Sequence, residues 1–379
     1  MVTTAGGERV RAYLPRPLPP EPPLRLDAEL QDLLERANRG LGRLDGVARL
    51  FPDPQMFLYM YVRKEALLSS QIEGTQSSFS DLLLYETDEA PGVPLDDVEE
   101  VSHYVAAMTH ALKRIHGGFP LSLRLIRETH GILLSGGRGR NKAPGAFRRT
   151  QNWIGGSRPG NASFVPPPHE RVMELMGQLE RFLHDDPVKT PLLIKAALTH
   201  VQFETIHPFL DGNGRTGRLL IPLLLCAEKA LTEPLLYLSL YFKTHRAAYY
   251  SLLQRVRTEG AWEAWLHFFL DGVAQTTEQA TRTAQRILAL FEANRKRVDK
   301  LGRAAASALH LHTVFQEKVI LSIAGAARRT RLSQPAATKA ILNLERLGIV
   351  RETTGGRRNR LFVYDAYLKL LAEGTEPIR

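Results

Sequence analysis

One histidine, one acid, three glycines and two arginines fall within twelve positions of this sequence, in HPFLDGNGRTGR at residues 207–218. Glycines let a backbone approach phosphate closely, and arginine forks match its oxygens. Asp211 on its own would repel phosphate, so a bridging Mg²⁺ is the expected compensation. His207, as a neutral imidazole, could take the proton of an incoming hydroxyl. The stretch therefore predicts a site for a diphosphate or triphosphate with Mg²⁺, next to a base.

The same glycines allow a second interpretation, because Gly212, Gly214 and Gly217 form the G-x-G-x-x-G pattern of dinucleotide-binding folds. That pattern has meaning only after a buried strand in a βαβ unit. Here IKAALTHVQFETIHPF precedes it and RLLIPLLLCAEKAL follows it, both with helical patterning. The loop therefore presents its N–H groups at a helix N-terminus, which favours an anion site. A purely structural turn is the remaining alternative, and such turns rarely collect reactive groups of four kinds.

The rest of the chain must position this loop, and its composition is that of an ordinary soluble protein. It has 379 residues, 44% hydrophobic and 24% charged, so we expect two or three packed units. No apolar run reaches the roughly 20 residues of a membrane span, and the first residues lack the apolar core of a signal peptide. A single cysteine, Cys226, excludes an internal disulfide framework. We expect a cytoplasmic protein without membrane contact.

Helical patterning dominates up to about residue 300, so the predicted fold class is mainly α. It covers LDAELQDLLERANRGLGRLDG, PQMFLYMYVRKEALLSSQIEG, VSHYVAAMTHALKRI and HERVMELMGQLERFLHDD. Two short strand-like pieces, TQNWI and ASFVP, interrupt it and predict a projecting β-hairpin. The proline-rich PRPLPPEPPLRL near the start should run extended over the surface.

The C-terminal segment differs from the rest in its predicted secondary structure, since two helical stretches are followed by a strand, a glycine turn and a strand. FQEKVILSIAG, LSQPAATKAILNLERLG and IVRETTGGRRNRLFVY give the outline of a winged helix. From Lys318 to Arg360 there are ten Lys or Arg and two acids, so most of the net charge of +10 lies here. A DNA partner and a basic protein-docking surface explain this equally well. The basic side chains in question are Arg328, Arg329, Arg331, Lys339, Arg357, Arg358 and Arg360.

HPFLDGNGRTGR resembles the signature of the Fic family, and so do the preceding QFETI, the predicted hairpin and the following YYSLLQRVRTEGAWEAWLHFFL. The resemblance implies four parts: an N-terminal helical region (1–100), a catalytic core (101–275) with a hairpin called the flap (145–168), a connecting helix (276–310) and a winged helix (311–379). It implies transfer of AMP from ATP to a Ser, Thr or Tyr hydroxyl of a target protein, with release of pyrophosphate.

The resemblance also assigns roles to single residues. His207 would be the general base and Asp211 the Mg²⁺ ligand. The phosphate-binding residues would be Gly212, Asn213, Gly214, Arg215, Thr216, Gly217 and Arg218. The flap residues Gln151, Asn152, Trp153 and Ile154 would hold the target by strand addition. Tyr249 or Tyr250 would stack near the nucleotide base, with packing in the core as the open alternative.

SSQIEG, residues 69–74, poses a separate electrostatic problem. Glu73 lies at the end of a predicted helix, where the macrodipole disfavours a carboxylate by a few tenths to about 1 kcal/mol unless a cation compensates it. The stretch resembles the N-terminal inhibitory motif of the Fic family, with Ser69 and Glu73 in its defining places. The resemblance implies that Glu73 pairs with Arg218 and blocks the γ-phosphate.

Several alternatives stay open within and beyond this resemblance. The protein could mainly remove AMP, or could use another phosphate donor, such as one carrying UMP or phosphocholine. It could also be a DNA-binding regulator whose core only senses nucleotide. Self-modification and a homodimer are further expectations.

Overall fold

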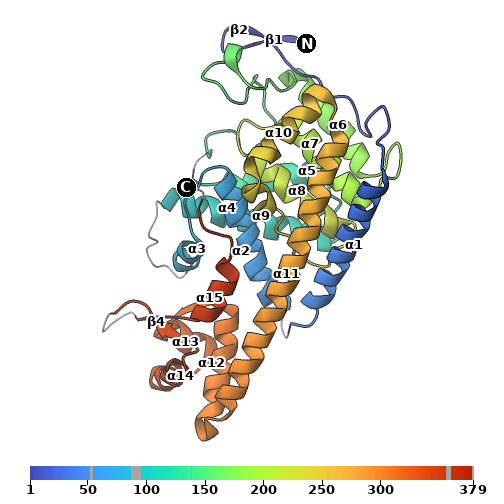
Figure 1. Ribbon diagram of the computed structural model, residues 1–379. Helices are drawn as coiled ribbons and strands as arrows, with labels where there is room; N and C mark the ends of the chain where they lie inside the picture. Colours follow the sequence, from blue (N-terminus) through green and yellow to red (C-terminus); the bar gives the residue numbers. More distant parts are fainter. Residues whose placement is uncertain (52–53, 87–94, 138, 356–359, 378–379) are drawn as a thin grey trace.

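The computed structural model describes residues 1–51, 54–86, 95–137, 139–355 and 360–377, and only the backbone of residues 54–59. The fold is mainly α-helical, as the sequence predicts (Figure 1). In the described part of the chain, no helix combines the length and apolar character of a membrane span. The helices are α1 (Ala28–Ala48), α2 (Pro54–Ile72), α3 (Phe79–Tyr85), α4 (Leu95–His116), α5 (Leu123–Leu133), α6 (Val172–Leu183), α7 (Leu192–Ile206), α8 (Asn213–Ala227), α9 (Ser239–Thr244), α10 (Arg246–Glu259), α11 (Trp262–Asp299), α12 (Ala305–Glu317), α13 (Ile323–Thr330), α14 (Gln334–Arg346) and α15 (Asp365–Ala372).

Helix α1 lies along the long helix α11 on one side of the molecule (Figure 1). A Cβ at Gly40 of α1 would lie 2.2 Å from Thr277 Oγ1 of α11, so glycine permits this close approach. The buried side chains of α1 recur at the spacing of one helix face: Leu30, Leu33, Ala37, Leu41 and Leu44. The predicted boundary between residues 275 and 276 lies inside α11, which continues without a break toward the C-terminal region.

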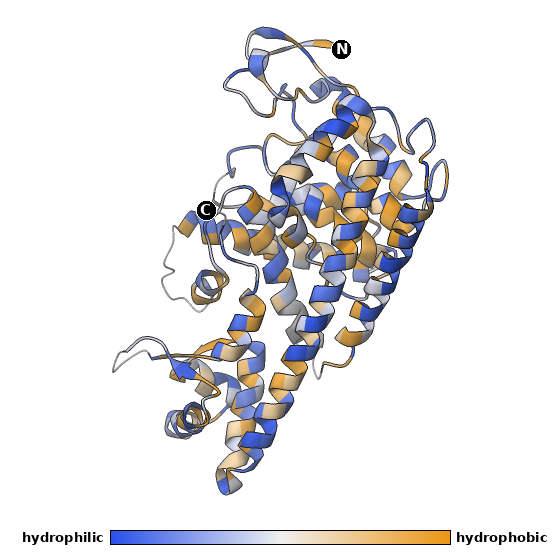
Figure 2. Ribbon diagram, in the orientation of Figure 1, coloured by the Kyte–Doolittle hydropathy of each residue, from blue (hydrophilic) through white to orange (hydrophobic). Residues whose placement is uncertain are grey.

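Helices α7 and α8 form the centre of the core, and the loop between them is HPFLDG. Residues 193–206 of α7 are all buried, and the hydropathy colours of Figure 2 show apolar residues concentrated in these central helices. Trp265 Nε1 donates to the carbonyl of Ala197 at 2.9 Å, which fixes α11 to α7. The loop of interest is therefore held at both ends by buried helices, as the sequence predicts. The described residues contain no parallel sheet, so the dinucleotide-fold interpretation is wrong.

The predicted flap is paired at one point only. Between TQNWI and ASFVP there is a single antiparallel bridge, from Ile154 to Phe164. A one-turn 3-10 helix, Pro159–Asn161, lies between the two pieces. The ladder cannot extend beyond ASFV, because residues 166–168 are prolines and lack the donor N–H. The flap is thus a bridged loop and not a regular hairpin.

A hairpin that the sequence analysis did not anticipate stands beside the flap. Strands β1 (Val2–Ala5) and β2 (Glu8–Arg11) pair antiparallel. The amide of Tyr13 then donates to the carbonyl of Val165 at 2.9 Å, so the N-terminal segment supports the return piece of the flap. Four-residue strands around Gly6 and Gly7 carry too little periodicity to be distinguished from a loop in the sequence.

The C-terminal module comprises the described residues of 305–377. Its three short strands are β3 (Ile320–Ser322), β4 (Arg351–Glu352) and β5 (Leu361–Val363), with β5 in the middle of an antiparallel sheet. Helices α12, α13 and α14 pack together beside it. The predicted wing residues Arg357 and Arg358 lie outside the described residues. Helix α15 leads back from this module toward α2 and α3 (Figure 1).

Candidate functional site

The loop between α7 and α8 is shaped by two left-handed residues and one asparagine. His207 ends α7 with φ +51°, and Gly212 precedes α8 with φ +74°. The side chain of Asn213 closes the turn, because its Oδ1 accepts the Phe209 amide and its Nδ2 donates to the Phe209 carbonyl, both at 2.9 Å. Asn213 can therefore offer an anion only its backbone N–H. The side chain of Phe209 is fully buried and anchors the loop in the core.

His130 holds the loop from α5, and the sequence analysis missed it. Its ring stacks on Phe209 with centroids 3.6 Å apart. Nε2 is 3.0 Å from the Asp211 carbonyl, and Nδ1 accepts the Gly145 amide at 2.9 Å, so the ring is a neutral tautomer with Nε2 protonated. Burial lowers the pKa of His130 to about 4, which keeps it neutral at physiological pH.

His207 lies at the edge of the cleft in front of α8. Burial, together with the positive charges of Arg257 and Arg148, lowers the pKa of His207 to about 3. Its Nδ1 is buried and has no hydrogen-bond partner among the described residues. The imidazole is therefore neutral and can accept a proton.

A cleft of about 310 Å³ opens at the N-terminus of α8. The residues that line it come from the loop, the first turn of α8, helix α4 and the residue after α2: Glu73, Glu100, His207, Leu210, Asp211, Gly212, Asn213, Gly214 and Arg215. The first N–H groups of a helix have no partner within it, and the macrodipole is positive there. The lining thus brings together the predicted base, the predicted metal ligand and the predicted anion cradle.

The residues present fit Mg²⁺ held jointly with phosphate. Asp211 Oδ1 accepts the Gly212 amide at 2.6 Å, and its carboxylate faces the cleft. The described residues contain no cluster of three or more His, Cys, Asp or Glu side chains that could enclose an ion on their own. Mg²⁺ commonly takes one or two carboxylates, with substrate phosphates and water completing its shell. Asp211 supplies such a carboxylate.

Glu73 occupies the space directly above the N-terminus of α8. Its Oε1 lies 2.6 Å from Arg218 NH2, which is the ion pair that the resemblance implies. A Cβ at Gly214 would lie only 2.3 Å from the same Oε1, so the carboxylate sits over the proposed anion cradle. Ser69 also binds Arg218, since its hydroxyl accepts from Nε at 2.9 Å and its carbonyl from NH2 at 3.0 Å.

Arg215, the other arginine at the start of α8, is paired as well, with a residue that the sequence analysis missed. Arg215 NH1 lies 3.1 Å from Glu100 Oε1 of α4, and both side chains are buried. The acids of PLDDVEEVSH are typical of a first helical turn, so nothing in the sequence distinguished Glu100.

Two predicted phosphate ligands face away from the cleft. The Thr216 hydroxyl is buried and donates to the Gly212 carbonyl within its own helix, at 2.8 Å. A Cβ at Gly217 would lie 2.5 Å from Glu204 Oε1, so this glycine allows α8 to approach α7 closely. Both residues shape the helix that presents the cradle, and neither lines it.

The structure places Tyr249 in the core, contrary to the predicted nucleotide contact. Its side chain is 1% exposed and its hydroxyl is 2.8 Å from His200 Nε2. Phe242 stacks on its ring with centroids 4.6 Å apart. Tyr250, which is 42% exposed, is the only one of the two with an accessible ring. The two tyrosines are consecutive residues of α10, and the helical periodicity of the sequence did not decide which of them faces inward.

The four predicted flap residues differ in their surroundings. Asn152 Nδ2 donates to the Phe209 carbonyl at 3.1 Å, which ties the flap to the loop. Gln151 Nε2 donates to the Pro166 carbonyl at 2.9 Å, across the base of the flap. Trp153 is 37% exposed, and Ile154 forms the bridge described above. A hydrophobic side chain is therefore displayed beside the cleft-facing loop.

Comparison with known proteins gives consistent results. The Fic/DOC family N-terminal model matches residues 31–113 and the Fic/DOC family model residues 120–225. The chain is 34% identical over 135 residues to protein adenylyltransferase Fic of Drosophila erecta, and 30% over 188 residues to that of Drosophila grimshawi. These matches cover 35% and 49% of this chain, but only 24% and 36% of those relatives.

A solved structure supports the fold. The crystal structure of a Fic family protein from Desulfovibrio desulfuricans superposes with a TM-score of 0.60 at 19% identity, covering 91% of this chain and 98% of that one. At this identity the likeness shows the fold alone. Two family models that together span the N-terminal helices and the central loop carry the assignment. The chain belongs to the Fic/DOC family.

Proposed function

We propose that the protein is an adenylyltransferase that moves AMP from ATP to a hydroxyl side chain of a target protein and is inhibited by its own Glu73. One observation carries the proposal. The neutral imidazole of His207, the carboxylate of Asp211 and the N-terminus of α8 share one cleft, and the carboxylate of Glu73 covers the anion cradle. The curated relatives named above carry the activity in their names. The match covers about a third or less of their length, so the activity comes to this chain as a proposal.

In this proposal each group has one task. His207 takes the proton of the target hydroxyl, whose oxygen then bonds to the α-phosphorus of ATP while pyrophosphate leaves. The backbone N–H groups of residues 213 and 214 bind phosphate oxygens at the helix N-terminus, beside the Gly212 amide that donates to Asp211. Asp211 and the phosphates would hold Mg²⁺, which would neutralise part of the phosphate charge. Positioning and charge neutralisation supply most of the rate in such reactions.

Inhibition would follow because Glu73 and a phosphate of ATP compete for the same position at the N-terminus of α8. The Glu73 carboxylate lies on Arg218 and above Gly214, where a phosphate of ATP would bring a like charge. Two anions cannot share one arginine and one helix terminus without strong repulsion. Either Glu73 moves or the triphosphate takes a different, unreactive pose.

The test uses purified protein, Mg²⁺ and α-labelled ATP, with label on protein as the readout. We expect weak labelling of the wild type, strong self-labelling of Glu73→Gly and none of Glu73→Gly combined with His207→Ala. Glu259→Gly is the matched control, because Glu259 also ends a helix, precedes a glycine and pairs with an arginine, Arg255. It should label like the wild type.

Other results would redirect the proposal. If no variant is labelled while bound ATP is still detected, AMP transfer to the protein itself is wrong. Removal of AMP from a modified substrate and transfer from other phosphate donors would then be measured with the same variants. Strong labelling of the wild type would contradict the inhibitory role of Glu73. A cytoplasmic location and a homodimer stay predictions of the same kind.

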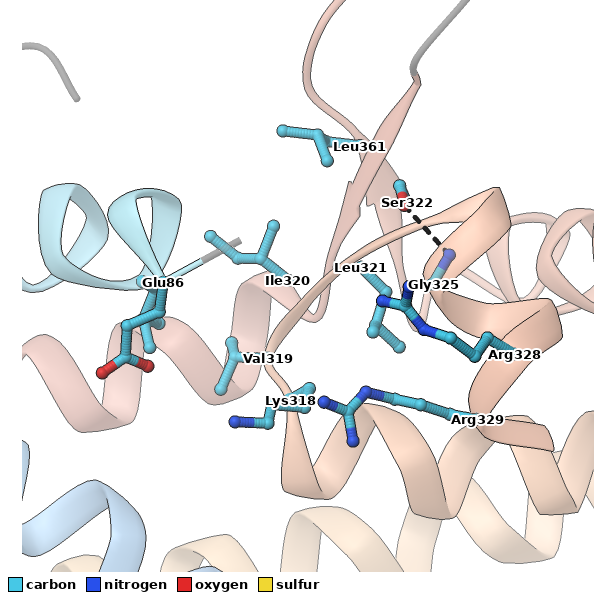
Figure 3. Close-up of a pocket in the computed structure, with 11 residues that line it drawn as sticks. Glu86, Lys318, Val319, Ile320, Leu321, Ser322, Gly325, Arg328, Arg329 and Leu361 are labelled. Carbon is cyan, nitrogen blue, oxygen red and sulfur yellow. Dashed lines mark hydrogen bonds between the residues drawn. The ribbon is translucent and has the colours of Figure 1, made fainter. Parts of the chain in front are cut away.

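A second function is favoured by the C-terminal module, which we propose to be a winged helix that binds duplex DNA through α14. Arg331, Lys339 and Arg346 are exposed on or just before this helix. Arg328 and Arg329 instead line a cavity of about 120 Å³ beside α3. Figure 3 shows Arg329 and Lys318 directed toward the side of that cavity where Glu86 lies. The proposal that this module binds DNA therefore depends on the three basic side chains on or just before α14.

A mobility shift with random duplex at several salt concentrations tests this function. DNA binding predicts an affinity that falls with salt, and Lys339→Glu should weaken it and lower the salt slope by about 1. Arg36→Glu, on the exposed face of α1, is the control for a change of net charge. No shift at low salt would leave the module as a protein-docking surface.

A further inference from the structure

A buried arginine joins the flap to the proposed base. The side chain of Arg148 is 3% exposed, and its guanidinium donates only to backbone carbonyls. Nε donates to His207 at 2.9 Å, and NH2 to Pro167 at 2.5 Å and to Ile206 at 3.4 Å. NH1 donates to Thr150 at 3.3 Å. One side chain therefore contacts both legs of the flap and the end of α7.

These contacts address two local needs. The left-handed backbone of His207 is unfavourable for a residue with a side chain, so the surrounding structure has to maintain it. The flap has a single bridge of its own, so its distance from the loop depends on contacts at its base. A planar guanidinium can meet both needs at once, because its five donors are spread over three nitrogens, whereas an ammonium group carries its three donors on one atom.

We propose that Arg148 is a positioning residue that sets the place of the flap relative to His207, and so aligns the target hydroxyl with its base. The proposal rests on the proposed function. Arg148 does not line the cleft at the N-terminus of α8, so its loss should leave ATP binding intact. It should lower transfer, because misplacement by about 1 Å costs on the order of 100-fold in rate.

The test compares Arg148→Gln and Arg148→Lys in the Glu73→Gly background. We expect the glutamine variant to keep the Kd for ATP and lose about 100-fold in the self-labelling rate, with partial rescue by lysine. Hydrogen exchange of residues 149–154 should increase in both. Arg63→Gln, which removes another buried arginine, bound to Glu86, is the matched control.

Two outcomes would overturn this role. The first is an unchanged labelling rate in Arg148→Gln. The second is a loss of ATP affinity as large as the loss of labelling rate, because this would indicate a general defect of the fold. If Glu73→Gly itself gives no label, the proposed function has failed. The exchange measurement then still decides whether Arg148 holds the flap.

An independent set of contacts ties the end of α2 to the end of the chain. Gln71, two residues before Glu73, is buried, and its Nε2 donates to the Thr375 carbonyl at 2.8 Å and to the Ser77 carbonyl at 2.9 Å. Lys243 of α9 donates to the carbonyls of Gly374 and Glu376. Residues 373–377, here called the tail, thus lie against the inhibitory helix.

The tail fits its place closely. Gly374 has φ +79°, and a Cβ there would lie 2.9 Å from Leu240 Cδ1. Thr375 is buried, and Glu373 pairs with Arg286 of α11 at 2.9 Å. In Figure 1 the described residues that follow α15 run upward beside α2. The tail is the last part of the C-terminal module, so movement of that module changes the contacts of α2.

We infer that the tail is a latch that keeps the end of α2, and with it Glu73, on Arg218, and that release of the tail relieves the inhibition. This inference also rests on the proposed function. A partner that draws the C-terminal module away would be the activating signal.

Gly374→Val tests the latch, since the left-handed backbone and Leu240 leave no room for the side chain. We expect faster hydrogen exchange in residues 69–77 and self-labelling raised about five- to tenfold over the wild type, the effect of losing one or two hydrogen bonds. Combined with Glu73→Gly, it should add nothing. Gly118→Val is the matched control, because Gly118 has φ +82° and open space around its Cβ.

Gln71→Met removes the same contact from the side of α2 and serves if the valine variant folds poorly. Unchanged exchange in residues 69–77 in either folded variant would overturn the latch, and so would unchanged labelling beside a strongly labelled Glu73→Gly. If Glu73→Gly is unlabelled, the proposed function fails by itself. The exchange data then report on the latch alone.

Discussion

Two carboxylates, those of Glu73 and Glu100, pair with the two arginines at the start of α8, and the two pairs differ in their burial. Glu100 and Arg215 are both buried, with side chains 4% and 5% exposed. The Glu73 side chain is 36% exposed, although its partner Arg218 is only 1% exposed. Glu100 lies within α4, whereas Glu73 follows the last residue of α2.

The difference separates a fixed pair from a displaceable one. Removing Glu100 would leave Arg215 charged and almost fully buried, without the carboxylate that pairs with it. Removing Glu73 leaves Arg218 with both Ser69 contacts and with the Glu204 carboxyl nearby, whose pKa burial raises to about 7. Glu73 can therefore leave its arginine at low cost, as an inhibitor that must be relieved has to do. Glu100 instead fixes the orientation of Arg215 beside the cleft.

The largest effect should come from breaking the fixed pair. Glu100→Ala leaves a buried charge without its partner, so we expect a loss of about 3–5 kcal/mol in the free energy of unfolding, measured by urea denaturation. In the Glu73→Gly background, self-labelling should fall about 100- to 1000-fold, because Arg215 is no longer held toward the phosphates. Unchanged labelling would show that Arg215 needs no partner to act.

The displaceable pair should respond in the opposite sense. Glu73→Gln keeps the shape of the side chain and removes its charge. We expect the free energy of unfolding to change by about 1 kcal/mol or less, because the carboxylate is partly in solvent. Labelling should nevertheless rise toward that of Glu73→Gly. A loss of stability as large as that of Glu100→Ala would erase the distinction between the two pairs.

The contrast also marks the limit of sequence reasoning. Gly212, Asp211 and His207 lie close together in the chain, so their types and spacing predicted a phosphate site, and the structure brings all three to one cleft. The Glu73–Arg218 contact was expected only through the resemblance, since the macrodipole argument demands a cation without naming one. Glu100 and Arg148 carry no such local signal, because the contacts of Glu100 with Arg215 and of Arg148 with His207 join residues more than fifty positions apart.

Side-chain direction was the second limit. Thr216, Gly217 and Tyr249 lie in the right segments but face the interior, and a one-residue difference on a helix turns a side chain by about 100°. The flap and the N-terminal hairpin were misjudged for another reason. Their strands are at most about four residues long, and their pairing is decided by contact with each other.

A smaller effect is expected from Ser69→Ala. The change removes the hydroxyl that accepts from Arg218 Nε and leaves the Ser69 carbonyl and Glu73 in place. One lost hydrogen bond predicts a two- to fivefold rise in self-labelling, well below that of Glu73→Gly. Ser70→Ala is the control, since the Ser70 hydroxyl is buried without a hydrogen-bond partner among the described residues. A rise as large as that of Glu73→Gly would make Ser69 the principal restraint.

The smallest effect should be that of mild acid on the inhibited protein. Burial alone would raise the pKa of Glu73, but the charge of Arg218 outweighs it, and the pKa lies below the ordinary value of 4.5. A carboxylate with a lowered pKa stabilises the folded pair above its unfolded pKa, and the effect is lost only as the pH falls through the folded value. His207, with a pKa of about 3, also stays neutral in this range.

Wild-type labelling should therefore stay low and flat from about pH 8 to pH 5.5, far above the titration of either group. The measurement is the initial labelling rate across this range, with Glu73→Gly as the uninhibited reference at each pH. A ratio of wild type to variant that rises as the pH falls toward 5.5 would mean that Glu73 is protonated there. Arg218 would then not hold the carboxylate in its charged form, and Glu73 could leave the cradle by protonation instead of by movement of α2.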